Sequence, residues 1–147
     1  MLAIVNPFDP RAVLFAKHAQ HVVLVQFPIA LPITAVGFDI AGERLKIPAL
    51  ATVAPYNLGV AAVATIPNVI TGILAWQGQL EGHKLRGILL QHLVMALVSS
   101  MLIWLAWWLR PRDARRSVRL PVELLAVLAI GLTAHPGGFL GGVNLPG

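Results

Sequence analysis

Four stretches of the chain contain no Asp, Glu, Lys or Arg, and each is long enough for a membrane-spanning helix of about 20 residues. The uncharged stretches are residues 18–38, 47–80, 87–109 and 124–147. Their apolar positions do not keep to one helical face, whereas a soluble helix bundle has a polar outer face on each helix. We therefore predict four transmembrane helices over residues 21–40, 49–76, 87–109 and 121–135.

Short polar connections join these helices, which predicts an all-α, polytopic membrane protein with an up-down bundle. Pro28 and Pro32 interrupt the first helix. Because proline lacks a backbone N–H, we expect a bend there that makes room beside His21 and His92. Residues 1–20 are expected to form an N-terminal interfacial segment and residues 21–147 the transmembrane domain. The sequence shows no internal repeat of the kind that marks inverted transporter halves.

Composition agrees with a lipid environment. Of the 147 residues, 57% are hydrophobic and 12% are charged, whereas soluble domains average about 45–50% apolar and about 25% charged residues. The chain has no cysteine, so disulfides and thiolate ligands are excluded. It also lacks a paired carboxylate, a nucleophile–base arrangement and a phosphate-binding loop. We therefore expect a non-catalytic protein, at most a subunit of an oxidoreductase complex.

The cations divide unequally between the two sides of a four-helix topology. Both termini and the second connection share one side, with Arg11, Lys17, Lys84 and Arg86. The other side carries Arg44, Lys46, Arg110, Arg112, Arg115, Arg116 and Arg119. By the positive-inside rule, the first and third connections face the cytoplasm. This predicts a bacterial inner membrane protein with periplasmic termini, whose arginines meet anionic lipid and not nucleic acid. Asp39 and Glu123 are expected to be interfacial charges near Arg44 and Arg119.

All five histidines fall in the outer half of this topology. His18 and His21 begin the first helix, His83 lies in the second connection, and His135 closes the fourth helix. His92 lies five residues inside the third helix, roughly 8 Å below its outer end. An ionisable side chain at such a depth marks a candidate functional site. The alternative is an imidazole whose hydrogen bonds are all satisfied by a carbonyl or amide of a neighbouring helix.

Histidines that converge from facing helices would hold a b-type haem by axial ligation. We expect His21 and His92 to be the axial, metal-binding pair, with His135 or His18 as a substitute ligand. Lys17 and Arg86 would then lie near the haem propionates. Room for the macrocycle is predicted beside the glycines of residues 135–142 and a small and polar stripe of the second helix. The stripe consists of Asn57, Ala61, Thr65, Asn68 and Gly72.

The start of the first helix, HVVLVQFPIALPITAVGFDIAG, resembles the DUF2231 family of small bacterial four-helix membrane proteins. The matching family positions are His21, Phe27, Pro28, Ile29, Ala30, Leu31 and Asp39. Gly72, Trp76 and His92 correspond to further family positions, and the C-terminal segment HPGGFLGGVNLPG corresponds loosely. The chain departs from the family pattern at Gln26, Ala75 and Ala96. Relatives joined to Rieske-type iron–sulfur domains imply a redox setting by association.

These observations leave three functions open. The first is a subunit of a larger membrane redox complex that carries haem b near the periplasmic face and passes electrons between quinone and an outer partner. The second is a cofactor-free anchor or assembly subunit, which the departures from the family pattern favour. The third is an accessory subunit that holds a chlorin through one histidine.

Overall fold

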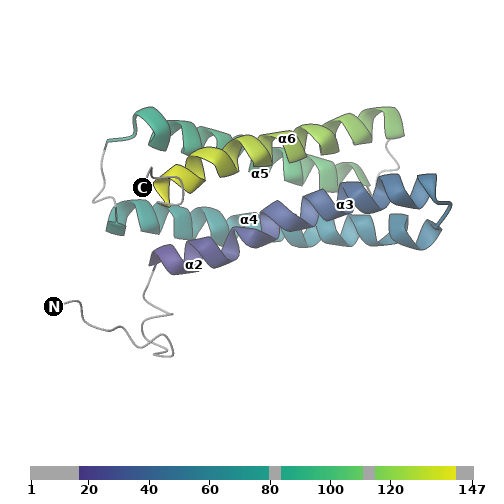
Figure 1. Ribbon diagram of the computed structural model, residues 1–147, viewed down its shortest axis with the longest axis horizontal. Coiled ribbons are helices and arrows are strands. Elements are labelled where there is room, and N and C mark those ends of the chain that lie inside the picture. Colours follow the sequence, from purple (N-terminus) through teal and green to yellow (C-terminus); the bar gives the residue numbers. More distant parts are fainter. Residues whose placement is uncertain (1–16, 80–83, 111–114, 142–147) are drawn as a thin grey trace, which may run out of the picture.

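The computed structural model describes residues 17–79, 84–110 and 115–141, and these residues form helices and short turns without a strand (Figure 1). The helices are α2 (Lys17–Leu24), α3 (Gln26–Arg44), α4 (Pro48–Gln79), α5 (Gly87–Leu109) and α6 (Arg116–Leu140). Four spans, counting α2 and α3 as one, are long and apolar enough to cross a membrane. The predicted fold class, an all-α membrane protein with four transmembrane helices, is confirmed. The predicted segment of residues 1–20 lies outside the described residues, apart from the first turn of α2.

The fourth span is longer than the sequence pattern predicts. It begins at Arg116 and not at Pro121, and it continues through Pro136 to Leu140. Pro136 and the two glycines after it would end a helix in water. In lipid the backbone has no solvent partner, so the helix continues and satisfies its own hydrogen bonds.

The first span is interrupted at Val25, between α2 and α3. Pro28 has no N–H to donate to the carbonyl of Leu24, so one rung of the hydrogen-bond ladder is missing there. Bonds on either side persist, from Val25 N–H to His21 (2.9 Å) and from Ile29 N–H to Val25 (3.3 Å). Val25 itself keeps α-helical φ and ψ angles of −62° and −21°, and Pro32 lies inside the continuous helix α3. The predicted bend that makes room beside His21 and His92 stays a prediction.

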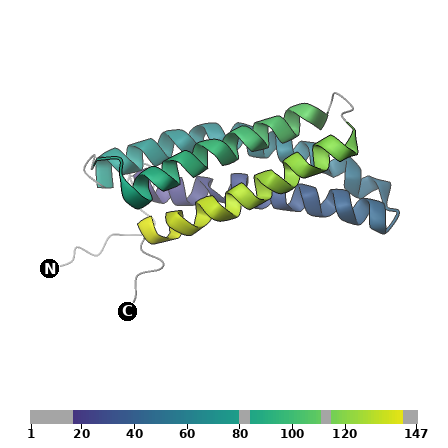
Figure 2. The same ribbon diagram turned by 90° about the horizontal axis from the view of Figure 1, so that it is seen from above.

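The helices pair as two hairpins that lie side by side. The first span packs along α4 and α5 packs along α6, while smaller contacts between α4 and α5 and between α3 and α6 join the hairpins. Figure 2 shows that α2 begins, and α6 ends, at the same end of the bundle. A short turn closes the first hairpin, where Ile47 N–H donates to Gly42 O (2.8 Å). Gly87 begins α5 with φ +58°, a left-handed conformation that favours glycine.

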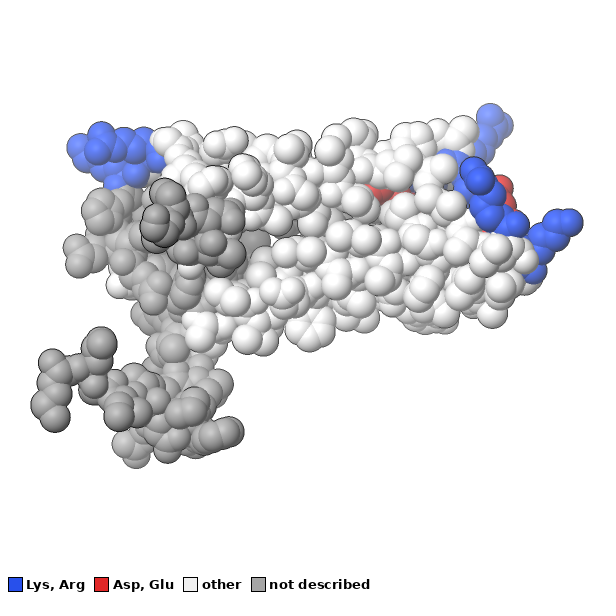
Figure 3. Space-filling model, in the orientation of Figure 1, with Lys and Arg blue, Asp and Glu red and all other residues white. Residues whose placement is uncertain are grey.

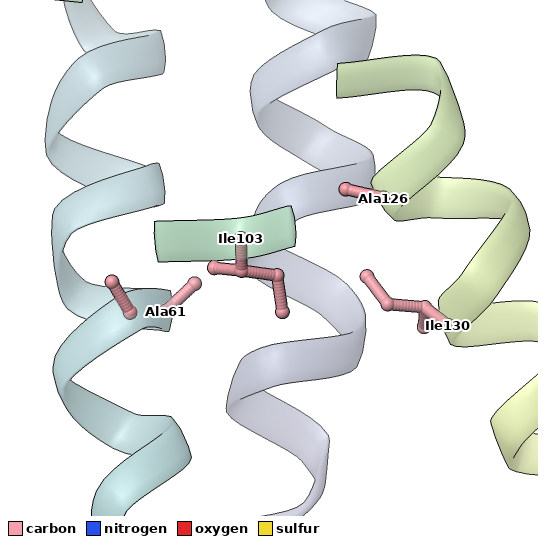
Figure 4. Packing of buried hydrophobic residues seen from close by; sticks show 5 residues of the cluster. Ala61, Ile103, Ala126 and Ile130 are labelled. Carbon is pink, nitrogen blue, oxygen red and sulfur yellow. The ribbon is translucent and has the colours of Figure 1, made fainter. Parts of the chain in front are cut away.

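Small side chains fill the interior, and most of the large apolar ones face outward. Figure 4 shows Ile103 of α5 between Ala61 of α4 and the pair Ala126 and Ile130 of α6. A second cluster consists of Ala35, Ala54, Leu58 and Ala106. Outward-facing valines, leucines and isoleucines are about half exposed. A soluble bundle would bury such residues, whereas small interior residues are typical of transmembrane packing.

Charged side chains gather at the two ends of the bundle, as the face in Figure 3 shows. We call one end the histidine end; it carries His21, His92, Lys84 and Arg86. We call the other the arginine end; its described cations are Arg44, Lys46, Arg110, Arg115, Arg116 and Arg119. The sequence pattern therefore predicts correctly how these cations divide between the two ends.

A buried ion network ties the hairpins together at the arginine end. Arg110 lies 3.1 Å from Asp39 and 2.8 Å from Glu123, and Arg119 lies 3.2 Å and 3.5 Å from the same two carboxylates. Asp39 and Glu123 are only 5% and 1% exposed. The sequence suggested that these two carboxylates are interfacial charges, whereas the structure buries both inside the bundle. Arg119 is a partner as predicted, but Arg110 takes the place expected for Arg44, which is exposed.

Candidate functional site

A cavity of about 710 Å³ lies between the two hairpins and reaches the histidine end. Every span contributes to its lining, and most of the lining side chains are apolar. Its volume falls within the range of about 300–1,000 Å³ that is usual for ligand pockets. The polar lining residues include His21, Gln26, Asn68, His92 and Thr133.

The two histidines that the sequence predicts as a pair both line this cavity. His21 approaches from α2 in the first hairpin. Its Nδ1 lies 3.1 Å from the carbonyl oxygen of Asn68 and 3.4 Å from Oγ1 of Thr71, both on α4. A ring with Nδ1–H donating to a carbonyl has its orientation and tautomer fixed, so Nε2 is the nitrogen that can coordinate a ligand.

His92 repeats this arrangement in the second hairpin. It lies on α5, and its Nδ1 is 3.1 Å from the carbonyl oxygen of Thr133 on α6. The Thr133 hydroxyl donates to Ala129 O (2.7 Å) and lies 3.5 Å from Oγ of Ser99. Both imidazoles are therefore held by a backbone carbonyl of the neighbouring helix, four residues before a glycine.

Those glycines are packed directly against the imidazoles. A Cβ built on Gly72 would lie 3.0 Å from Cε1 of His21, and a Cβ on Gly137 would lie 2.9 Å from Cε1 of His92. The contact at Gly137 is shorter than real Cβ atoms make, and the contact at Gly72 is tighter than most of them, so alanine at either position would push against the imidazole ring. The glycines thus give each imidazole its place beside the cavity.

The other candidate residues do not join this pair. His135 is exposed and lines a separate hollow of about 430 Å³ between α5 and α6, where its ring packs edge-on against Phe139. Arg86 is exposed just before α5 and does not line the cavity, although its neighbour Leu85 does. The side chains of Lys17 and His18 lie outside the described part of the structure, and so does His83.

Sequence reasoning finds the histidines but not their partners, because these partners are backbone carbonyls of Asn68 and Thr133. The predicted small and polar stripe of α4 does contain Asn68 and Gly72, and its Thr65 accepts a hydrogen bond from Trp104 Nε1 (3.0 Å). On the same helix, Gly59 packs closely against Trp107: a Cβ built on Gly59 would lie 2.9 Å from Nε1 of Trp107. The stripe is therefore a contact face for helix packing and for one imidazole.

The side-chain oxygen of Asn68 is buried beside the cavity and has no hydrogen-bond partner among the described residues. Over the same part of the chain, no three His, Cys, Asp or Glu side chains come together as a metal site. Two imidazoles alone do not complete the coordination sphere of a bare metal ion. They do suit a metal whose remaining ligands come with it, as in a porphyrin. The mostly apolar lining of the cavity would suit such a group, whereas the space beside Gly72 and Gly137 is filled by the imidazoles themselves.

The comparisons with known proteins support the membrane assignment. Residues 17–144 match the family described as predicted membrane protein (DUF2231). No curated protein and no solved structure matches the chain. Because the family match covers all five described helices and most of the sequence, the chain belongs to the DUF2231 family of membrane proteins.

Proposed function

We propose that this protein is a non-catalytic membrane subunit that holds a b-type haem between His21 and His92 and takes part in electron transfer. The observation that carries the proposal is the matched pair of imidazoles on one cavity. Each Nδ1 is engaged by a carbonyl of the adjacent helix, at 3.1 Å in both cases. Such second-shell carbonyl bonds are the usual way in which proteins orient a metal-binding imidazole.

The cavity suits a large apolar group. Its lining includes the aliphatic side chains of Val25, Leu89, Leu93 and Ile130. These side chains exclude water and lower the local dielectric, which tunes the redox potential of a bound metal. A haem held there would supply one-electron transfer between its two iron oxidation states. His21 and His92 would bind it, and the carbonyls of Asn68 and Thr133 would orient the two rings.

The surroundings support a position near the periplasmic face of a bacterial inner membrane. Most of the cations in the described part of the chain lie at the arginine end, whereas Lys17, Lys84 and Arg86 lie at the histidine end. The positive-inside rule then orients the histidine end and both chain termini toward the periplasm. Lys84, Arg86 and Lys17 are candidates to lie near the propionates. A larger redox complex, with quinone as electron donor or acceptor, is the corresponding partner.

The test is a visible spectrum of the full chain purified in detergent from haem-replete cells. We expect the split reduced-minus-oxidised bands of a low-spin haem, and we expect His92→Ala to abolish them. Because that variant loses a cavity-lining side chain, His135→Ala serves as a matched control that keeps both imidazoles of the cavity. A folded wild-type protein without these bands, also after incubation with haem, would contradict the proposal.

One observation favours a second function, a cofactor-free anchor or assembly subunit. Each imidazole already has a hydrogen-bond partner on its neighbouring helix, and His21 also lies near the Thr71 hydroxyl. In that case the imidazoles fasten helices within each hairpin, and the lipid-facing helices dock onto a larger partner. A colourless, folded protein that co-purifies with a stable partner would support this function. Far-red absorbance would instead indicate a chlorin held by one histidine.

A further inference from the structure

The two hairpins repeat one pattern of residues. Residues 20–23 read Gln-His-Val-Val and residues 91–94 read Gln-His-Leu-Val. His21 and His92 are as far apart in the sequence as Asp39 and Arg110, which are 71 positions apart and form the ion pair at the opposite end of the bundle. Both spans therefore have the imidazole near one end and a buried charge near the other.

Burial follows the same correspondence along the whole length of the hairpins. At an offset of 71 positions from α3 to α5, and of 65 positions from α4 to α6, most buried positions of the first hairpin fall on buried positions of the second, whereas Val36, Ala54, Ala62 and Ala75 fall on half-buried ones. The matching pairs are Pro28 and Ser99, Pro32 and Ile103, Ala35 and Ala106, Leu58 and Glu123, Ala61 and Ala126, Thr65 and Ile130, and Thr71 and Pro136. Helical periodicity alone aligns most buried positions once one buried pair is aligned, so this register gains its weight from the residues of the histidine site, which follow it as well.

The site obeys the correspondence as well. Asn68 and Thr133, whose carbonyls hold the imidazoles, occupy equivalent positions in α4 and α6. Gly72 and Gly137, which pack against the rings, are equivalent too, with Cβ positions 3.0 Å and 2.9 Å from Cε1. Both hairpins start at the histidine end, so the repeat is parallel. Parallel repeats in membrane proteins are related by rotation about an axis along the membrane normal.

We infer that the chain is built from two equivalent helical hairpins around the cavity, and that His21 and His92 are equivalent ligands of a single group bound between them. The ligand part of this inference rests on the proposed function. It selects a group that is coordinated from two opposite sides, such as the metal of a planar macrocycle. A chlorin with one axial histidine, or an amphiphile that uses one hydrogen bond, would give the two rings unequal roles.

The first experiment titrates the purified full chain, its His21→Ala and His92→Ala variants and a His135→Ala control with hemin. We expect a low-spin spectrum for wild type and control. Both cavity variants should shift to the same high-spin spectrum with similarly weakened affinity, and added imidazole should restore the low-spin form in both. An affinity difference between the two cavity variants of more than about tenfold, or a low-spin spectrum retained by one of them, would overturn the equivalence while leaving haem binding intact.

The second experiment does not depend on haem. The chain has no cysteine, so spin labels can be attached to cysteine pairs at exposed, equivalent positions. Val23 with Ile70 probes the first hairpin, and Val94 with His135 probes the second. We expect the two distance distributions to coincide. The two experiments therefore fail separately. In the hemin titration, a wild-type chain that takes up no hemin would contradict the proposed function and the ligand coordinated from two sides, but not the equivalence of the hairpins. Distributions whose means differ by a helical turn, about 5.4 Å, would contradict the equivalent hairpins.

Discussion

An imidazole within a membrane-spanning helix needs partners for both nitrogens, because an unsatisfied buried polar group costs about 1–3 kcal/mol. In both His21 and His92, a helix carbonyl is the partner of Nδ1. Such a carbonyl is already used by the helix ladder, so it offers its second lone pair. The approach is possible because the residue four positions later is glycine. The histidine site therefore depends on glycine at positions 72 and 137, because a Cβ atom on Gly72 or Gly137 would occupy space that the imidazole needs.

This dependence predicts that Gly72→Ala and Gly137→Ala are each destabilising by about 1–3 kcal/mol, the usual cost of overpacking. The new methyl group would overlap the imidazole edge and break its bond to the carbonyl. Unfolding in a graded SDS–detergent mixture measures the loss. Gly37→Ala and Gly131→Ala are matched controls, since a Cβ on either meets nothing within 4 Å. They should be neutral or slightly stabilising, because alanine favours helix by about 1 kcal/mol over glycine. Equal losses of unfolding free energy in all four variants would contradict the idea that Gly72 and Gly137 make room for the imidazoles.

The second residue-scale prediction concerns Arg110, which contacts Asp39 and Glu123 from a position 9% exposed. Arg110→Met keeps an unbranched apolar stem and removes the guanidinium charge, so among the described residues the two buried carboxylates depend on Arg119. Breaking a buried ion pair usually costs about 3–5 kcal/mol, and we expect about 3 kcal/mol because Arg119 contacts both acids. The same unfolding measurement on Arg44→Met, an exposed arginine of the same end, should show little change. A loss below about 1 kcal/mol for Arg110→Met would contradict the role of the network.

At the scale of the helices, hydrophobic length alone predicts where the spans lie, and α5 occupies the predicted residues 87–109. It does not predict the ends of α6, because Pro136 and Gly137 signal a helix end only where water can take over the backbone bonds. Depth along a span also follows from counting residues. The direction of a side chain around the helix does not, because each residue turns the direction by about 100°. His21 and His92 share a cavity, whereas His135, at the same end, faces another hollow.

Pro28 is predicted to cause the break between α2 and α3. Pro28→Ala restores the N–H that can donate to the Leu24 carbonyl, so α2 and α3 should join into one helix. We expect the restored bond to change the direction of α2 relative to α3, to move His21 away from the Asn68 carbonyl and so to weaken hemin binding. Hydrogen–deuterium exchange of residues 22–30 should slow as the missing rung forms. Pro55→Ala is the control, since Pro55 lies inside the uninterrupted helix α4. Unchanged exchange at residues 22–30 would show that the interruption has another cause.

On the scale of the whole molecule, the hairpins are held together differently at the two ends of the bundle. The ion network closes the arginine end, and it joins α3 to α5 and α6 through Asp39, Arg110 and Glu123. The cavity separates the hairpins toward the histidine end. A group bound in this cavity would contact both hairpins and so would link them where their own side chains do not meet. Binding to the folded state alone adds stability that grows with ligand concentration, so hemin should raise the unfolding midpoint of wild type and leave that of a His21→Ala, His92→Ala double variant nearly unchanged.

The same division of charge carries the last prediction, the orientation of the bundle. Because the chain has no cysteine, single cysteines report on their own side of the membrane. Lys84→Cys lies at the histidine end and Leu45→Cys at the turn of the arginine end, and both positions are exposed. In intact spheroplasts, a membrane-impermeant maleimide should label Lys84→Cys, and Leu45→Cys should react only after the membrane is opened. The reason is the positive-inside rule, by which we expect the cation-rich arginine end to face the cytoplasm. The reverse pattern would place the imidazoles near the cytoplasm and exclude a periplasmic electron partner.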